Sequence, residues 1–211
     1  GVKPEKTTQL DLGLQLRSER LDAWVSAYAG RLQDYILFQY RSGGMMGSST
    51  QARNVDARIA GAEAGLEWRP TQAWKLGSTL AYAWGENRSE NRPLPQIPPL
   101  EGRFSASYEQ SRWSVGALLR AVSRQSRVAQ DEGNVVARDL GPSAGFATLS
   151  LNGAYRINDG LRASVGVDNL FDRAYAEHLN LAGSADFGFP ADPVRINEPG
   201  RSFWLKLDYR Y

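Results

Sequence analysis

The chain has 211 residues, of which 42% are hydrophobic, so its length and composition allow a single domain. Its 25 basic and 23 acidic residues nearly cancel, and the arginines are spread along the chain, which argues against nucleic acid as a partner. With no Cys and one His, the chain cannot form a disulfide framework, a thiolate metal site or a multi-histidine zinc site. No apolar run approaches the roughly 18 to 20 residues of a membrane-spanning helix, but a spanning β-barrel stays open.

The order of apolar and polar residues predicts an all-β chain. Apolar side chains recur at every second position over nine stretches, which is the period of a strand with one apolar and one polar face. Segments rich in Gly and Ser, in Pro or in polar residues separate these stretches and indicate turns and loops. The nine predicted strands are 8–17, 21–38, 59–68, 74–84, 104–108, 113–121, 148–155, 161–170 and 203–211.

The connections between these strands alternate strictly between short turns and long loops. Short turns are predicted at 18–20, 70–72, 110–112 and 156–160. Long loops are predicted at 39–53, 86–100, 123–145 and 171–199. An outer-membrane barrel has short turns on one side, long loops on the other and strands of about 9 to 11 residues. The order therefore predicts a transmembrane antiparallel up-and-down β-barrel, since a soluble sandwich has no reason to keep it.

An odd number of strands indicates an incomplete barrel wall. Bacterial single-chain barrels have an even number of strands, and an open edge cannot stand in lipid. We therefore expect residues 1–211 to be part of a larger barrel whose other strands pair with the free edge of the terminal strand. The first six residues, GVKPEK, contain no signal peptide, so an exported chain would be a processed or excised piece.

Four segments resemble one protein family. GVDNLFDRAYAEHLN (166–180) carries the most specific element, NLFD followed by Tyr175. Together with RLQDYILF (31–38), PLPQIPPLEGRFSASY (93–108) and GRSFWLKLDYRY (200–211), it resembles the C-terminal part of a TonB-dependent outer-membrane receptor, over nearly the whole chain. Within that family, AEHLNLAGSADFGFPADPVRINEPGR (176–201) is most similar to the copper-receptor group.

The resemblance implies a barrel of about 22 strands with an N-terminal plug inside it, in the outer membrane of a Gram-negative bacterium. It implies energised uptake of copper, as cargo of the whole receptor, and no cofactor within this chain. The family's plug, TonB box and main copper-binding Cys/Met and His/Met elements have no counterpart here. The implied partners are the missing plug and barrel portion, the TonB complex, outer-membrane lipid and the barrel assembly machinery, whose signal the terminal aromatic Tyr211 resembles.

Two other classes of function stay open on the residues alone. A passive porin-like channel or another outer-membrane barrel would share the strand pattern, and a soluble β-sandwich binding domain would need no detergent to fold. An enzyme is not expected, because no GxSxG, HExxH or GxGxxG motif occurs and nothing pairs a nucleophile with an oriented base. We therefore predict no catalytic residue.

Met45 and Met46, the chain's only methionines, are the candidate metal ligands. They lie together in the Gly/Ser-rich loop 39–53. Thioether sulfur is a soft ligand suited to Cu(I), so an exposed pair at the mouth of a copper receptor would pass ions inward through transient contacts. The alternative is that the two flexible side chains fill a gap beneath the loop.

The remaining candidates have a structural interpretation as well as a functional one. His178 would either ligate metal or take a structural hydrogen-bonding role, with Glu177 as its companion. Charged residues on the polar face would line a pathway or pair with each other, the plug or water. They are Glu63, Glu67, Lys75, Arg103, Arg120, Arg162, Asp168, Lys206 and Arg210. Aromatic residues near strand ends fit the girdles at the two membrane interfaces, or a core if the domain is soluble.

Overall fold

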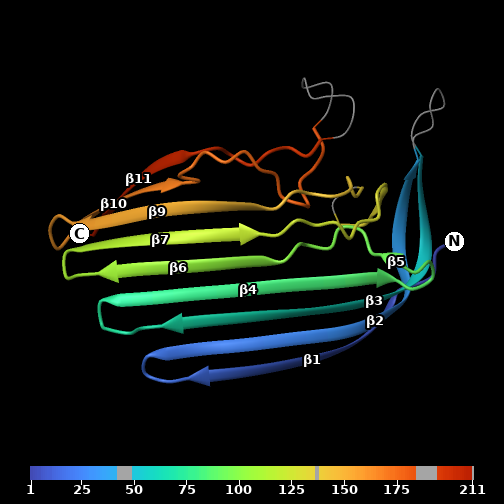
Figure 1. Ribbon diagram of the computed structural model, residues 1–211, viewed down its shortest axis with the longest axis horizontal. Coiled ribbons are helices and arrows are strands. Elements are labelled where there is room, and N and C mark those ends of the chain that lie inside the picture. Colours follow the sequence, from blue (N-terminus) through green and yellow to red (C-terminus); the bar gives the residue numbers. More distant parts are fainter. Residues whose placement is uncertain (42–48, 136–137, 184–193, 211) are drawn as a thin grey trace.

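The computed structural model describes residues 1–41, 49–135, 138–183 and 194–210 (Figure 1). Nine strands of these ranges form one antiparallel sheet in the order β1-β2-β3-β4-β6-β7-β9-β10-β11. Two short strands, β5 (Arg92–Pro93) and β8 (Glu132–Gly133), pair with β4 and β2. The nine strands are β1 Lys6–Arg17, β2 Leu21–Arg41, β3 Ser49–Trp68, β4 Trp74–Asn87, β6 Glu101–Glu109, β7 Trp113–Val122, β9 Phe146–Arg156, β10 Leu161–Asp168 and β11 Ser202–Tyr209.

Each of the nine strands pairs with its neighbours along the chain, so the predicted antiparallel up-and-down order is confirmed. Figure 1 shows the short turns at one end of the sheet and the long connections at the other. No helix of the described ranges is long and apolar enough to cross a membrane.

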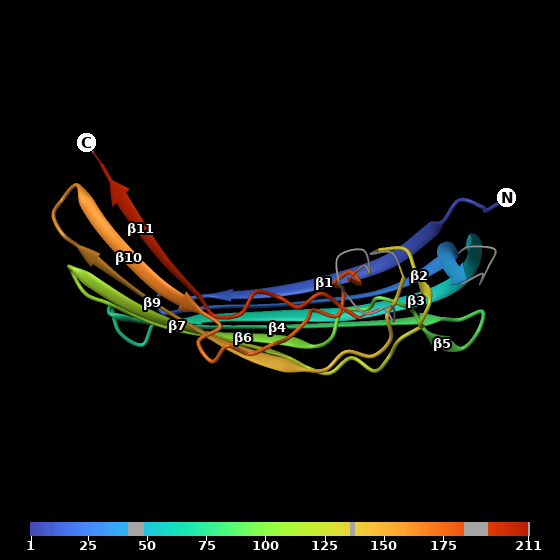
Figure 2. The same cartoon turned by 90° about the horizontal axis from the view of Figure 1, so that it is seen from above.

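The sheet is a curved, open wall (Figure 2). Within the described residues, β1 pairs only with β2 and β11 pairs only with β10, so both are edge strands. Nine antiparallel strands leave β1 and β11 running in the same direction, as Figure 1 shows. They cannot pair antiparallel with each other, so closing the wall in lipid requires further strands at both edges.

The hairpin of β2 and β3 is longer than predicted. The sequence predicts a loop over 39–53, but β2 continues to Arg41 and β3 begins at Ser49. The register shifts between Leu32 and Tyr35, and beyond this point the hairpin bends away from the wall (Figure 1). Pairing of β2 with β1 ends at Gln33, and farther along β2, Phe38 and Gln39 pair with β8. The Tyr40 amide donates to the Asp131 carbonyl at 2.8 Å. A contact about 90 residues away in the chain therefore stabilises this extension, which local periodicity cannot reveal.

The two faces of the wall differ sharply. Cross-strand partners share a face, so the register places the alternating apolar residues of every strand on one side. These side chains are unusually exposed for their type, for example Leu14 at 76% and Phe203 at 78%. On the opposite, inner face a small core of Leu32, Ala57 and Leu94 forms where the long connection after β4 packs on the wall. An apolar face this exposed requires an apolar solvent, as a barrel wall does in a bilayer.

Aromatic side chains mark the short-turn end of the apolar face. The Trp74 and Tyr108 rings lie 5.0 Å apart between centroids, and Tyr108 and Trp113 lie 5.5 Å apart. Trp68, Tyr155 and Tyr209 lie at the same ends of their strands and are exposed. This row has the position and composition of a girdle at a membrane interface, as the sequence predicts.

Large aromatic residues on the inner face lie over glycines of neighbouring strands. A Cβ atom on Gly65 would come within 2.3 Å of the Trp24 ring, and one on Gly166 within 2.2 Å of the Trp204 ring. Trp24 and Trp204 therefore face inward, and the outward face of β2 carries small residues such as Ala23, Val25 and Ala27.

Replacing Gly166 with Ala in the full-length protein should lower the amount of folded protein. The new methyl group would overlap the Trp204 ring, and such overpacking costs about 1 to 3 kcal/mol. Gly153→Ala is the matched control, because a Cβ there would meet nothing closer than 3.6 Å. Heat-modifiable gel mobility of the membrane-inserted protein measures the effect. Equal yields of the two variants would contradict this assignment of the inner face.

Candidate functional site

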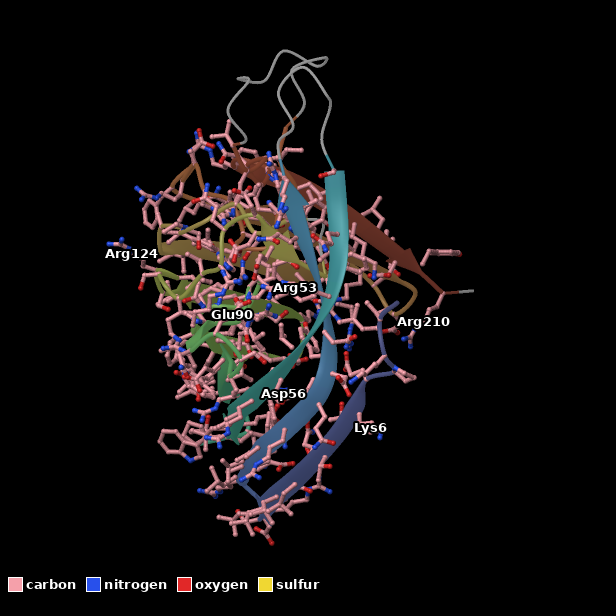
Figure 3. The ribbon with its side chains drawn as sticks, turned by 90° about the vertical axis from the view of Figure 1, so that its right-hand side faces the viewer. Lys6, Arg53, Asp56, Glu90, Arg124 and Arg210 are labelled. Carbon is pink, nitrogen blue, oxygen red and sulfur yellow. The ribbon has the colours of Figure 1, made fainter. Side chains whose placement is uncertain are left out.

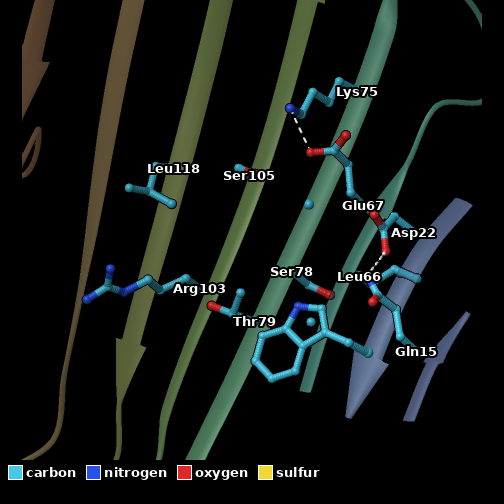
Figure 4. Close-up of a pocket in the computed structure, with 13 residues that line it drawn as sticks. Gln15, Asp22, Leu66, Glu67, Lys75, Ser78, Thr79, Arg103, Ser105 and Leu118 are labelled. Carbon is cyan, nitrogen blue, oxygen red and sulfur yellow. Dashed lines mark hydrogen bonds and ion pairs between the residues drawn. The ribbon is translucent and has the colours of Figure 1, made fainter. Parts of the chain in front are cut away.

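The inner face contains a polar groove of about 540 Å³ that crosses β1 to β7 (Figure 4). Glu67 of β3 and Lys75 of β4 lie on its upper wall in that view, with Lys75 Nζ 2.7 Å from Glu67 Oε2. The Gln15 side-chain amide donates to Asp22 at 3.3 Å, and Trp24 and Arg103 complete the lining. The groove presents fixed charges and hydrogen-bonding groups toward the interior of the barrel.

Most charges on this face are paired within the chain. Arg103 and Arg120 both bind Glu101, and Lys206 Nζ lies 2.7 Å from Asp208. The predicted pairing is thus found for Glu67, Lys75, Arg103, Arg120 and Lys206. Within the described part of the chain, no ion pair forms at Glu63, Arg162, Asp168 or Arg210.

An ion-pair cluster around one buried carboxylate, that of Glu132, lies at the long-loop end of the wall. Arg53 of the β3 extension donates to Glu132 of β8 at 2.7 Å, and Arg92 of β5 binds the same oxygen. Both arginines also pair with Glu90, and Figure 3, which views this end, shows Arg53 beside Glu90. The hydrogen bond from Arg53 lowers the pKa of Glu90. Four charges from three separate connections therefore meet, and Glu132 is only 2% exposed.

This cluster fixes the long connections to one another. The Gln96 side chain accepts hydrogen bonds from the amides of Asn134 and Val135 at 3.1 and 2.9 Å. Asp139, 3% exposed, accepts from the amides of Ala129 and Gly141. The described parts of the connections after β4 and β7 and of the β2–β3 extension are thus joined by hydrogen bonds and ion pairs into one unit, the rim.

A second cluster ties the connection before β11 to the wall. Arg120 of β7 binds Glu177 as well as Glu101, and its guanidinium lies 5.2 Å from the centroid of the Phe146 ring. Phe146 in turn packs on Tyr175 with centroids 4.2 Å apart. The Glu177 carboxylate therefore forms its ion pair with Arg120.

His178 has a different partner from the one predicted. Glu177 pairs with Arg120, and it is the Ser143 hydroxyl that lies 3.0 Å from His178 Nδ1. The residue is 6% exposed, and burial, followed by the positive charge of Arg195, lowers the pKa of His178. The ring is thus held neutral in a hydrogen-bonded, structural position. The prediction of Glu177 as companion is wrong because the Arg120 guanidinium binds that carboxylate instead.

The contact between Ser143 and His178 brings a hydroxyl to an imidazole, which the sequence does not predict. A catalytic pair needs a third group that orients the imidazole and supports its protonation. His178 Nε2 is buried and has no hydrogen-bond partner among the described residues. Burial and the charge of Arg195 lower the pKa of His178, and the charge of Asp139 opposes them with a smaller effect.

Met45 and Met46, the predicted metal ligands, lie outside the described residues, as does Tyr211. Within the described ranges, no group of three or more His, Cys, Asp or Glu side chains is arranged to hold a metal ion. The methionine assignment stays a prediction.

Glu132→Gln in the full-length protein should loosen the contacts between the long connections. The substitution removes the charge that binds two arginines, at a cost of about 1.5 to 3 kcal/mol. Hydrogen exchange of the amides of β8 and the β2 extension should then accelerate. Glu86→Gln is the control, because Glu86 pairs with Arg88 at 3.3 Å on the surface and such pairs contribute about 0 to 1 kcal/mol. Unchanged exchange in Glu132→Gln would contradict the role of the cluster.

Comparison with known proteins gives consistent matches. A family model described as the TonB dependent receptor-like β-barrel matches residues 1–170. The structure of the copper transporter OprC is 58% identical, with a TM-score of 0.94, over 99% of this chain and 32% of that chain. The ferric-pyoverdine 358 receptor of Pseudomonas putida is 26% identical in an alignment 163 residues long, which covers 71% of this chain and 18% of the receptor.

A mutant of the ferric enterobactin receptor PfeA from Pseudomonas aeruginosa shares the fold, with a TM-score of 0.73 at 24% identity, over 99% of this chain and 31% of that chain. The chain thus spans about a third of the solved receptors it matches. The family model covers most of the chain and the strand order agrees with it. The chain belongs to the TonB-dependent receptor β-barrel family.

Proposed function

We propose that this chain is the C-terminal wall of an outer-membrane receptor that takes up copper ions in a TonB-dependent way. The observation that carries the proposal is the 58% identity to the copper transporter OprC over 99% of the chain. The siderophore receptors match at 26% identity or less over comparable lengths, so they support a ferric siderophore as cargo less than OprC supports copper. The exposed apolar face supports a location in the outer membrane.

In this proposal the wall has three roles. Its apolar face contacts lipid, and its free edges pair with the remaining strands of the same receptor. Its inner face, with the groove around Glu67 and Lys75, receives the plug, which would be the part that TonB pulls. Its fixed rim of long connections frames the entrance for the ion. None of these roles is chemical, and we propose that the receptor is not an enzyme.

Copper is cargo in this account, and its main ligands belong to parts of the receptor other than this wall. The chain has no Cys and one His, and that His is buried and bonded to Ser143. We propose that Met45 and Met46 add transient thioether contacts near the entrance, because in the sequence they lie between the ends of β2 and β3 and because thioethers suit Cu(I).

Uptake of radioactive copper by cells that carry the complete receptor tests the function. Accumulation should fall to background when either the receptor or TonB is deleted. Met45→Ala with Met46→Ala should raise the copper concentration needed for half-maximal uptake and leave the maximal rate unchanged, as expected for weak entrance contacts. Uptake that persists without TonB would indicate a passive channel, and uptake of a ferric siderophore in place of copper would contradict the ligand.

A further inference from the structure

Two arginines face each other on the outer side of the wall without a counter-charge. Arg31 of β2 and Arg58 of β3 are direct cross-strand partners, and both are exposed. Like charges placed directly opposite destabilise a sheet. The register puts them in line with Thr8 of β1, on the same face as the leucines of that strand.

The nearby carboxylates are engaged elsewhere. Glu86 is the cross-strand partner of Arg58, but it pairs with Arg88 at 3.3 Å. Asp56, on the same face as Arg58, accepts a hydrogen bond from the Asp34 amide at 3.2 Å. Among the described residues, no carboxylate lies within ion-pair distance of Arg31 or Arg58. The two guanidinium groups therefore keep their donors for a ligand from outside the chain.

These arginines lie at the boundary of the apolar face on the long-loop side, opposite the aromatic row. Arg58 precedes Trp68, a member of the aromatic row at the short-turn end, by ten residues of β3. At ~3.3 Å per residue and a tilt of ~40°, this separation is ~25 Å across the bilayer, the height of the apolar band of such barrels. Lys6, two residues before Thr8 in β1, lies at the same end (Figure 3). Lipid headgroups of the leaflet on the long-loop side are at this height.

An open groove of about 610 Å³ joins the arginines to the apolar surface below them. Its lining includes Arg31 and Arg58 together with Leu10, Ala29, Ala60 and Trp84. The Arg127 guanidinium lies 5.3 Å from the Trp84 ring centroid and adds a further positive charge beside the groove. Cationic groups at one end and apolar side chains at the other match a lipid with an anionic headgroup.

We propose that Arg31 and Arg58 form a binding site for the phosphate group of an anionic lipid in the leaflet on the long-loop side. Arginine donates two parallel hydrogen bonds to phosphate oxygens, so two facing guanidinium groups suit one phosphate. Leu10 and Trp84 contact the first part of the acyl chains. The proposal depends on the membrane placement of the barrel but not on the transported ion, so the two proposals can fail separately.

Lipid binding to the purified, delipidated receptor tests the site. Native mass spectrometry would follow the addition of lipid A, a phosphorylated glycolipid. Arg31→Gln with Arg58→Gln should weaken binding by about tenfold or more, because each interfacial basic residue contributes to the attraction of anionic lipid. Arg31→Lys with Arg58→Lys should keep part of the affinity. The matched control is Arg20→Gln with Arg112→Gln, which removes two exposed arginines from the turns at the opposite rim.

Two further measurements keep the proposal falsifiable if the glutamine variant fails to assemble. Dephosphorylated lipid A should bind the unaltered receptor about as weakly as lipid A binds the glutamine variant. Inorganic phosphate at millimolar concentration should not displace lipid A, because it lacks the apolar contacts. Equal binding of the two glycolipids, equal losses in the control variant, or full displacement by inorganic phosphate would each overturn the lipid assignment.

Discussion

Backbone hydrogen bonding in a medium without water is the constraint on which this structure depends. Every N–H and C=O group of a strand in lipid needs a partner strand, so the wall must be a continuous ladder with no free edge. The observed ladder is continuous from β1 to β11 and ends at two edges that run in the same direction. Two consequences follow: each edge of the ladder needs a further partner strand in lipid, and the apolar residues must all face one way. The exposed leucines of β1 satisfy that second requirement.

The inner face carries the polar and charged side chains, because it faces water or protein and not lipid. Charges there are paired locally, as in Glu67 with Lys75, and the largest aromatic rings lie over glycines. At the long-loop end the same principle holds the connections in place, because Glu132 is bound by two arginines from different segments. Removing a partner of the buried Glu132 carboxylate would leave a charge without compensation, which is why such a contact is costly to break. The long connections are therefore joined at the rim by ion pairs between segments that are far apart in the chain.

Much of the fold could be predicted from the sequence, because a strand with one lipid face and one wet face carries a period of two. The nine strands, the alternation of turns and loops and the incomplete wall follow from that period. Features set by distant contacts could not be predicted. The extension of β2 to Arg41 depends on pairing with β8, and Glu132 meets Arg53 across 79 residues of chain. His178 was singled out as the only histidine, but its partner, Ser143, lies in another connection with no local signal. The groove of Arg31 and Arg58 needs the register of two strands, which alternation alone does not give.

In this fold, alternate residues of each strand face lipid and the barrel interior. Because the chain has no Cys, single cysteines can be introduced along β4 of the complete receptor and spin-labelled in a bilayer. Labels at Leu76, Leu80 and Tyr82 should be accessible to oxygen dissolved in lipid, and labels at Gly77, Thr79 and Ala81 to a water-soluble nickel complex. Accessibility should thus alternate with a period of two residues. A constant or irregular profile along β4 would contradict the assignment of the two faces and the barrel built on it.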